Sequence, residues 1–302
     1  MDKRDITPAL AARLVAAQFP QWADLPVVPV AVDGWDNTTF RLGDELSIRL
    51  PSADGYVAQI DKEHRWLPIL ASQLPVRIPE PVARGRPDDR FPRPWSIYRW
   101  IEGQTVTGDR IGDLTALAGD LAGFLTVLEA IDASAGPPPG AHNFFRGAPL
   151  TVYDAECRTS IGDAADEIDV GAAGDVWQAA LASAWERPPV WVHGDVAPTN
   201  LLVKDGVLEA VIDFGCMAAG DPACDLVMAW TFFDDESRSV FRDTIDLDDA
   251  TWSRARGWAL WKALITYVRA RETGTDPDAT VRRFGWRVSA LDVVERVLAD
   301  RA

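Results

Sequence analysis

Cysteine and long apolar runs are both scarce in this sequence of 302 residues, and each shortage argues against a class of protein. The three cysteines are Cys157, Cys216 and Cys224. They cannot pair completely and form no Cys-x-x-Cys motif, so neither a disulfide framework nor a zinc site is expected. No apolar stretch is long enough to cross a bilayer, since Lys262 interrupts the stretch at 258–268. We therefore expect no membrane partner.

Positive charge is also in deficit, with 30 lysines and arginines against 46 acidic residues and a net charge of −16. A nucleic-acid-binding protein needs a cationic face, and no basic patch accompanies the 13 tryptophans, so no nucleic-acid partner is expected. A negative cleft would instead raise the local concentration of a cationic ligand. A generally acidic, soluble surface explains the same charge without a ligand.

An apolar targeting segment is missing near the first residue. Residues 1–5 are charged and no apolar core follows them, which is not the pattern of a signal peptide. We expect a cytoplasmic protein that acts as a monomer. Its length suits one large domain or two lobes with apolar cores.

The most informative part of the sequence is a predicted hairpin. Two apolar runs, 200–203 and 207–212, flank Lys204-Asp205-Gly206, a pattern typical of two strands joined by an Asp-Gly turn. Because a hairpin brings its ends together, we expect Asn200 and Asp213 to lie side by side.

Asp195 lies on the loop that leads into this hairpin. A carboxylate that accepts a hydroxyl proton would then lie beside Asn200 and Asp213, which are two oxygen ligands for Mg²⁺. Phosphoryl transfer from a nucleotide requires this arrangement.

The segment resembles the catalytic loop and metal motif of the aminoglycoside phosphotransferase and choline kinase branch of the protein-kinase-like superfamily. The matching elements are His193-Gly194-Asp195, Asn200, Ile212-Asp213-Phe214-Gly215, Gly220-Asp221-Pro222 and Asp225. Capping carboxylates and a turn residue would explain these residues singly but not their order and spacing together. The resemblance spans about residues 27–270. It implies an α+β, two-lobed fold, with a small antiparallel β-sheet lobe and a larger, mainly helical lobe.

The same resemblance implies a role for each residue. Asp195 accepts the substrate hydroxyl proton or orients the attacking oxygen, while Asn200 and Asp213 bind Mg²⁺ on the phosphates of ATP or GTP. His193 and Asp221 are expected to support the loop, together with Asp225. The carboxylates considered for binding ammonium groups of an acceptor are Asp225, Asp234, Asp235 and Glu236. For the last three, a solvated acidic helix end is the favoured interpretation.

Residues 39–42 and 46–50 read as two strands around a turn at 43–45. Alternation directs Leu46, Ile48 and Leu50 to one face and Ser47 and Arg49 to the other, where both are candidates for nucleotide contact. A helix follows from about Tyr56 to Leu67, where Pro68 should kink or end it.

Glu63 falls within the apolar stripe of that helix, where an unpaired carboxylate is costly, and Arg49 is its expected partner. Related enzymes use a strand lysine paired with a helix glutamate to hold the nucleotide phosphates, so Arg49 departs from their pattern. The alternative is that Glu63 is an ordinary solvated helix residue.

Two further regions are candidates for nucleotide contact. Residues 34–39 lie where kinases place a phosphate cover, so Thr38 or Thr39 could touch phosphate, although an ordinary hairpin turn fits equally well. Residues 95–101 resemble the last strand of the small lobe and the hinge, with Ile97, Tyr98 and Trp100 beside the purine. The predicted lobes are therefore residues 1–101, which bind the nucleotide, and 102–302, which bind the acceptor and carry the catalytic residues.

Beyond the hinge the pattern is mainly helical. Apolar residues at three-four spacing predict a buried helix over 114–131, and another is expected over about 176–185. Residues 141–175 read as irregular. The last part of the chain is expected to be helical, with a core that includes Trp252, Trp258, Trp261 and Leu264.

The sequence thus predicts a kinase that phosphorylates a hydroxyl group of an aminoglycoside-like antibiotic. A protein kinase is disfavoured because only residues 216–219 separate Ile-Asp-Phe-Gly from Gly-Asp-Pro, which leaves no room for an activation segment. Two alternatives stay open. One is a kinase of another small alcohol, such as a macrolide, a choline-like amine, an amino alcohol or a sugar. The other is a catalytically silent nucleotide-binding module.

Overall fold

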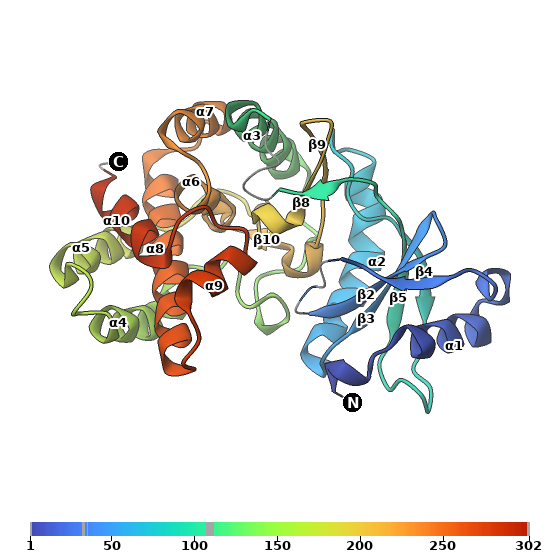
Figure 1. The fold of residues 1–302 in the computed structure, drawn as a ribbon. Helices are drawn as coiled ribbons and strands as arrows, with labels where there is room; N and C mark the ends of the chain where they lie inside the picture. Colours follow the sequence, from blue (N-terminus) through green and yellow to red (C-terminus); the bar gives the residue numbers. More distant parts are fainter. Residues whose placement is uncertain (1, 32–33, 35, 107–111, 301–302) are drawn as a thin grey trace. The chain divides into compact units, whose positions relative to one another are not determined.

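An antiparallel sheet with strand order β1-β2-β3-β5-β4 organises the N-terminal part of the chain (Figure 1). Its strands are β1 (Val27–Pro29), β2 (Asn37–Leu42), β3 (Leu46–Pro51), β4 (Pro81–Gly85) and β5 (Trp95–Arg99). In this computed structural model, residues 2–31, 34, 36–106 and 112–300 are described. They form two compact units, the first comprising Met1–Glu102 with Ile212–Gly215, and the second comprising Gly103–Val211 with Cys216–Ala302.

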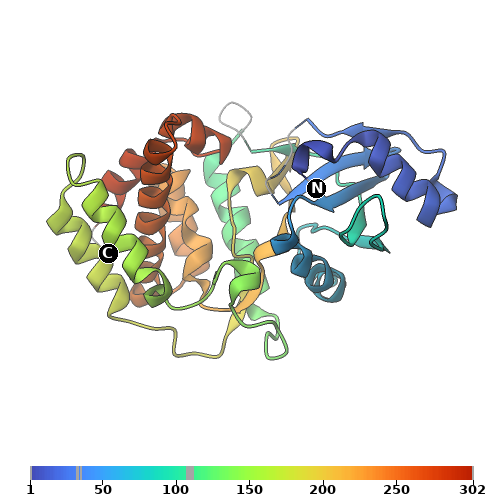
Figure 2. The same ribbon diagram turned by 90° about the horizontal axis from the view of Figure 1, so that it is seen from below.

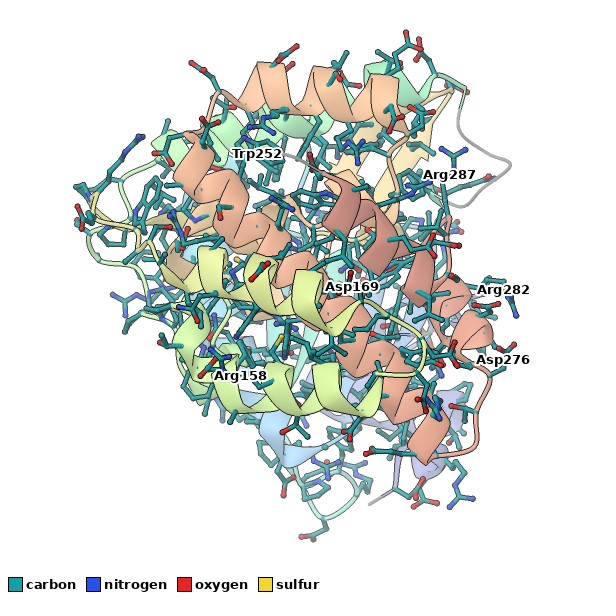
Figure 3. All side chains as sticks on the ribbon, turned by 90° about the vertical axis from the view of Figure 1, so that its left-hand side faces the viewer. Arg158, Asp169, Trp252, Asp276, Arg282 and Arg287 are labelled. Atoms are coloured by element: carbon teal, nitrogen blue, oxygen red, sulfur yellow. The ribbon has the colours of Figure 1, made fainter. Side chains whose placement is uncertain are left out.

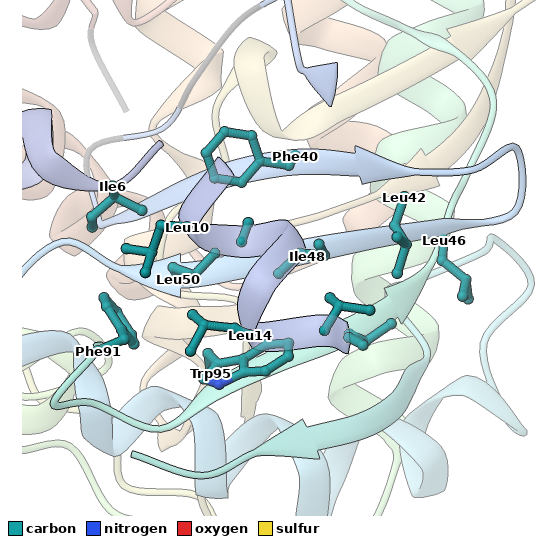
Figure 4. Packing of buried hydrophobic residues seen from close by; sticks show 13 residues of the cluster. Ile6, Leu10, Leu14, Phe40, Leu42, Leu46, Ile48, Leu50, Phe91 and Trp95 are labelled. Atoms are coloured by element: carbon teal, nitrogen blue, oxygen red, sulfur yellow. The ribbon is translucent and has the colours of Figure 1, made fainter. Parts of the chain in front are cut away.

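Helix α1 (Pro8–Gln18) covers the apolar face of this sheet. Thr7 caps the helix by accepting a hydrogen bond from the Leu10 amide, as its position before Pro8 predicts. Leu10 and Leu14 lie against Ile48 and the neighbouring strand residues, all of them buried (Figure 4). The predicted alternation of the second strand is therefore confirmed.

Helix α2 (Val57–Ala71) begins near the predicted position but does not end at Pro68. Pro68 is exposed and lies in the last turn of the helix, where it removes a single intrahelical hydrogen bond. Ile60, Leu67 and Leu70 are buried, as the apolar stripe predicts.

The second unit is mainly helical but contains two small sheets. One pairs β7 (Val190–Val192) with β10 (Ala218–Gly220), and the other has the order β6 (Gln104–Thr105), β8 (Leu201–Lys204), β9 (Val207–Val211). Strands β8 and β9 form the predicted hairpin, whose last pair is Leu201 with Val211. Asp205 and Gly206 both have positive φ, as an Asp-Gly turn requires.

Helix α8 (Asp249–Glu272) packs against α4 (Asp154–Asp163), α5 (Val170–Leu181), α9 (Pro277–Arg283) and α10 (Ala290–Ala299). The other helices of the second unit are α3 (Leu114–Ala130), α6 (Met228–Thr231) and α7 (Asp235–Ile245). Figures 1 and 2 both show α3 alongside α7. Trp252, near the start of α8, is buried, and Asp276 pairs with Arg282 on α9 (Figure 3). The four core residues predicted for this region, Trp252, Trp258, Trp261 and Leu264, are all buried.

Two predictions for the middle of the chain were wrong. Residues 141–175 are not irregular throughout, because α4 lies among them, and α5 begins at Val170, before the predicted 176. Only Cys157, Ser160 and Ile161 of α4 are buried. So few buried positions do not produce an apolar periodicity from which a helix could be predicted. Gly171 and Gly174 have low helix propensity, so the sequence does not indicate that α5 begins at Val170. Asp169 caps this helix.

The fold class predicted from the sequence, an antiparallel sheet lobe with a larger, mainly helical lobe, is confirmed. None of the helices in the described ranges combines the length and apolar character needed to cross a bilayer.

Candidate active site

Arg49 of β3 pairs with two carboxylates in the first unit. Its Nη1 lies 3.4 Å from Glu63 Oε1, and its Nη2 lies 2.8 Å from Asp213 Oδ1. The pair with Glu63 is the one that the sequence predicts. The pair with Asp213 was not predicted, and it shows that one guanidinium neutralises both acidic groups.

Burial governs the electrostatics of this cluster. Glu63 is 3% exposed, and burial raises the pKa of its carboxyl group even though Arg49 opposes the rise. Burial would lower the pKa of Arg49, but Glu63 and Asp213 outweigh burial and hold that pKa above its ordinary value. Tyr98 donates its hydroxyl to Glu63, and burial together with Glu63 keeps the pKa of that phenol well above its usual range. Arg49 therefore stays charged and Tyr98 stays a donor.

Asp213 adopts a left-handed backbone conformation, with φ of 67°. A residue other than glycine adopts this conformation only when its surroundings hold it there, and such residues gather at functional sites. Lys62 of α2 contributes to this hold by donating through Nζ to the Gly215 carbonyl at 2.7 Å. Sequence reasoning missed Lys62, because nothing local distinguishes a buried lysine from an exposed one beside Glu63.

Strand register decides which predicted nucleotide-binding side chains share the face of Arg49. Thr39 lies opposite Arg49, and Ser47 lies opposite Tyr98, so these four side chains share one face of the sheet. Ile97 instead lies opposite Ile48 in the apolar core, so its side chain is on the other face.

Thr38 is on the core face as well, because it lies opposite Leu50 in the ladder. Thr38 and Thr39 are strand residues rather than turn residues, which corrects the prediction of a phosphate-covering turn over 34–39. Within that segment, Trp35 lies outside the described residues. Trp100 follows β5, and its backbone N–H already donates to the Glu45 carbonyl at 2.8 Å. That N–H is therefore not available to a purine in this conformation.

In the second unit, Asp195 lies on the loop between β7 and β8. Asn200 Nδ2 donates to the Asp195 carbonyl at 2.9 Å and to Asp195 Oδ2 at 3.3 Å, which orients the carboxylate. Gly194 has φ of 82°, and a Cβ there would clash with the carbonyl of Cys216, so the loop requires glycine at this position.

Asp225 stabilises the backbone of the loop that carries Asp195. Its two oxygens accept hydrogen bonds from the amides of His193 and Gly194, both at 2.7 Å. It is 2% exposed, and burial raises the pKa of its carboxyl group. The supporting role predicted for Asp225 is therefore confirmed, and the alternative role of binding an acceptor ammonium was wrong, because the carboxylate is buried and occupied. His193 is also buried, and its Nδ1 lies 3.2 Å from the Asp195 amide.

Asp221 forms a buried ion pair with a residue of α8. Arg254 Nε lies 2.7 Å from Asp221 Oδ2, with side chains only 3% and 6% exposed. Sequence reasoning missed Arg254, which lies on α8 without a motif around it. The acidic stretch at 234–236 is a helix end, as favoured: Asp234 caps α7, and Asp235 pairs with Arg238 at 2.6 Å.

Lys262 of α8 pairs with the predicted catalytic carboxylate. Its Nζ lies 3.2 Å from Asp195 Oδ1, and the two side chains are 19% and 39% exposed. Burial alone would raise the pKa of Asp195, but Lys262 and Arg146, followed by His193, outweigh burial and lower it. Asp195 is therefore ionised at neutral pH. Sequence reasoning noted Lys262 only as an interruption of an apolar run.

The oxygen donors for Mg²⁺ are of the right chemical type. Asn200 donates through Nδ2, which leaves its amide oxygen for a cation, and Asp213 uses only Oδ1 in its pair with Arg49. Mg²⁺ commonly takes one or two protein oxygens and fills its remaining positions with phosphate and water. Within the described ranges, no group of three or more His, Cys, Asp or Glu side chains is arranged to hold a metal ion.

Comparison with known proteins places this geometry in context. A model of the phosphotransferase enzyme family matches residues 27–258. The structure resembles that of aminoglycoside 2'-phosphotransferase-IIIa with GDP, at a TM-score of 0.70 and 20% identity over 97% of this chain and 99% of that chain. It also resembles macrolide 2'-phosphotransferase from Brachybacterium faecium, at a TM-score of 0.57 and 23% identity over 86% and 91%. No curated protein matches the chain significantly. The family match confirms the resemblance to phosphotransferases, and the solved structures show that the fold is shared.

Proposed function

We propose that this chain, which belongs to the phosphotransferase enzyme family, transfers the γ-phosphoryl group of ATP or GTP to a hydroxyl of an aminoglycoside-like antibiotic. The observation that carries the proposal is Asp195, an ionised carboxylate on a loop that Asn200 and Asp225 hold in place. A general base needs this combination of fixed position and ionised state.

The reaction assigns one task to each group. The acceptor hydroxyl oxygen forms a bond to the γ-phosphorus, and its proton passes to Asp195. The bond from that phosphorus to the β–γ bridging oxygen breaks, and the nucleoside diphosphate leaves with the electron pair. Arg49, held by Glu63, binds the nucleotide phosphates. Positioning and charge neutralisation supply most of the acceleration in reactions of this type.

Asn200 and Asp213 are the residues that would hold Mg²⁺ in this proposal. The bound ion would neutralise charge on the β- and γ-phosphates. We further propose that the first unit binds the nucleotide and the second binds the acceptor, in a cytoplasmic monomer. Of the predicted nucleotide-binding side chains, Thr39 and Ser47 share the face of Arg49 and are the better candidates for contact with the nucleotide.

Two observations support an aminoglycoside-like acceptor. The net charge of −16 favours a cationic small molecule. Solved structures similar to this chain include an aminoglycoside phosphotransferase with streptomycin and ATP, at a TM-score of 0.61 and 18% identity over 95% of this chain and 98% of that chain. Because that likeness establishes only the fold, the acceptor has to be identified by assay.

A macrolide is the second candidate acceptor. The segment that carries Arg146 also exposes apolar side chains, with Phe144 at 44% and Phe145 at 39%, and Val152 is 46% exposed. Exposed aromatic side chains beside a catalytic loop suit an acceptor with a large apolar body.

The test is coupled turnover with ATP and GTP separately, against a panel of aminoglycosides, macrolides and small amino alcohols. We expect one acceptor class to stimulate turnover and to yield a phosphorylated product by mass spectrometry. Asp195→Ala should remove the stimulated rate, whereas Asp235→Ala, at an exposed helix end, should retain it. Nucleotide binding without turnover on any acceptor would favour the silent nucleotide-binding module instead.

A further inference from the structure

Arg146 carries a guanidinium that has no anionic partner among the described residues. It is stacked on two tryptophans of α8, 5.4 Å from the ring centre of Trp258 and 4.8 Å from that of Trp261. Its Nη1 is buried and has no hydrogen-bond acceptor in the described part of the chain. A buried donor without an acceptor is uncommon in folded proteins and calls for an explanation, and one explanation is a ligand that supplies the acceptor.

The surroundings of Arg146 hold its guanidinium in place. Trp261 Nε1 donates to Glu156 at 2.8 Å, and the Trp261 ring packs on Tyr153 with ring centres 4.1 Å apart. The backbone before Arg146 is strained, because Phe144 and Phe145 both have positive φ, at 53° and 56°. Strain held in place by surrounding contacts is a feature of binding sites.

Lys262 brings a second cation to the same place, one residue after Trp261. Its only side-chain partner in the described part of the chain is Asp195, at 3.2 Å. An ammonium has three donors, so Lys262 can contact an anion as well as Asp195. The catalytic loop itself, residues 193–200, contains no lysine or arginine. Arg146 lies beside the same loop, because a Cβ placed on Gly194 would lie 3.0 Å from Arg146 Cβ. The described part of the second unit therefore brings two cations, Lys262 and Arg146, to the loop that carries Asp195.

The chemistry at Asp195 identifies the anion. If Asp195 takes the proton of the attacking hydroxyl, the phosphorus that this hydroxyl attacks must come close to the same carboxylate. The transferring phosphoryl group carries its negative charge on three equatorial oxygens, and protein cations commonly stabilise that charge.

We propose that Arg146 and Lys262 form a subsite for the phosphoryl group, which they bind during transfer and on the phosphorylated product. This inference rests on the proposed function. Lys262 contacts Asp195 before the phosphoryl group arrives and exchanges part of that contact for phosphoryl oxygens when it does. Arg146 contributes the unsatisfied Nη1, held on its two tryptophans.

The test uses isothermal titration calorimetry on the full chain without nucleotide, so it does not depend on turnover. The probes are phenyl phosphate and benzoate, which share an aromatic ring and differ in the anion. We expect phenyl phosphate to bind, and Arg146→Met and Lys262→Met each to weaken its binding by about fivefold or more, as loss of a charge-assisted contact should. Arg146→Lys should restore part of the loss. The matched control Arg271→Met removes another cation of α8, which is exposed and stacks on Tyr267 at 5.5 Å from the ring centre, and should leave the affinity within about twofold.

Asp195→Asn sharpens the test, because it changes the other member of the Lys262 pair. Removing the carboxylate charge frees Lys262 and ends repulsion of the anion, so phenyl phosphate should bind about threefold tighter or more. Opposite effects from Asp195→Asn and Lys262→Met would not arise from damage to the fold. If Arg146→Met lowers the melting temperature strongly, the Lys262→Met and Asp195→Asn variants decide the question.

Three results would overturn the proposal. The first is no binding of phenyl phosphate to the unmodified chain. The second is equal binding to the unmodified chain and to both methionine variants, which would place the anion elsewhere. The third is benzoate binding as tightly as phenyl phosphate, which would assign the two cations to a carboxylate of the acceptor. A failed acceptor panel would count against the proposed function but would leave these binding results intact.

Discussion

Each of the two units places a cation against a carboxylate of the candidate active site, but the two ion pairs differ in kind. In the first unit, the Arg49 guanidinium, 16% exposed, contacts both Glu63 and Asp213. In the second unit, the Lys262 ammonium pairs with a single described carboxylate, that of Asp195, which is 39% exposed. A planar guanidinium between two carboxylates has a fixed geometry, whereas an ammonium on a flexible stem can exchange partners. The comparison indicates a permanent pair in the first unit and an exchangeable pair in the second.

Replacing the two functional carboxylates should give the largest effect and separate the two units. Asp195→Ala removes the proton acceptor, and we expect turnover to fall by about 10³-fold while Mg²⁺-nucleotide affinity stays within about twofold. Asp213→Ala should instead abolish Mg²⁺-dependent nucleotide binding. Steady-state kinetics and nucleotide titration with and without Mg²⁺ measure both effects. Retained turnover in Asp195→Ala would contradict the role assigned to it.

Removing the permanent cation should cost stability as well as nucleotide affinity. Arg49→Met leaves Glu63 buried without its partner, and we expect the free energy of unfolding to fall by about 3 kcal/mol in urea denaturation. Adding Glu63→Gln to this variant should recover part of the loss, because it removes the uncompensated charge. Equal stability of the single and double variants would show that Asp213, rather than Glu63, dominates the cost.

A buried carboxylate that no ion pair stabilises within the described ranges extends the comparison. Glu129 of α3 has a buried Oε1 with no hydrogen-bond partner among those residues, and burial, with Asp225 and Asp221, raises its pKa from 4.5 to about 8. The folded protein therefore binds a proton that the unfolded chain has released, so stability falls as pH rises from about 4.5 through 8.

Glu129→Gln should remove this pH dependence. We expect the variant to match the unmodified chain at about pH 5 and to be about 2 kcal/mol more stable at about pH 9, a value discounted for partial exposure. Urea unfolding at the two pH values measures the difference. No gain at high pH would mean that the Glu129 carboxyl group reaches water.

The smallest stability effect should come from the exchangeable pair. Lys262→Met should change the free energy of unfolding by only about 0.5 kcal/mol, because the pair is partly exposed. Its effect should appear in the pH dependence of kcat/KM. Lys262 lowers the pKa of Asp195, so its loss raises that pKa and moves the acidic limb of the profile to higher pH. An unmoved acidic limb would show that Lys262 does not set the ionisation of the base.

Local patterns account for the parts of the site that the sequence predicts. The Asp-Gly turn specifies the β8–β9 hairpin, and motif spacing locates Asp195 and Asn200 beside it. A glutamate in an apolar helix stripe, together with strand alternation, indicates the Arg49–Glu63 pair. The same alternation places Thr38 with Phe40 and Ile97 with Trp95, so the core positions of Thr38 and Ile97 could also have been predicted.

Tertiary packing accounts for the parts that the sequence does not predict. Lys262 and Arg254 lie on one helix, each far along the chain from its carboxylate, and no local pattern marks either residue. Arg146 follows two phenylalanines with positive φ, a backbone conformation that their residue type disfavours. These contacts depend on how α8 packs in the second unit, which single-sequence periodicity does not report.

The segment Ile212–Gly215 belongs to the first unit although the chain on both sides of it belongs to the second. The sheet unit is therefore discontinuous in sequence, and a fragment ending at Glu102 would lack the Asp213 carboxylate that pairs with Arg49. During synthesis, this cluster of charges can be completed only after the ribosome has passed Gly215, more than a hundred residues beyond the last strand of the sheet. A dissection of this protein into independent parts should therefore retain the Asp213 segment with the sheet.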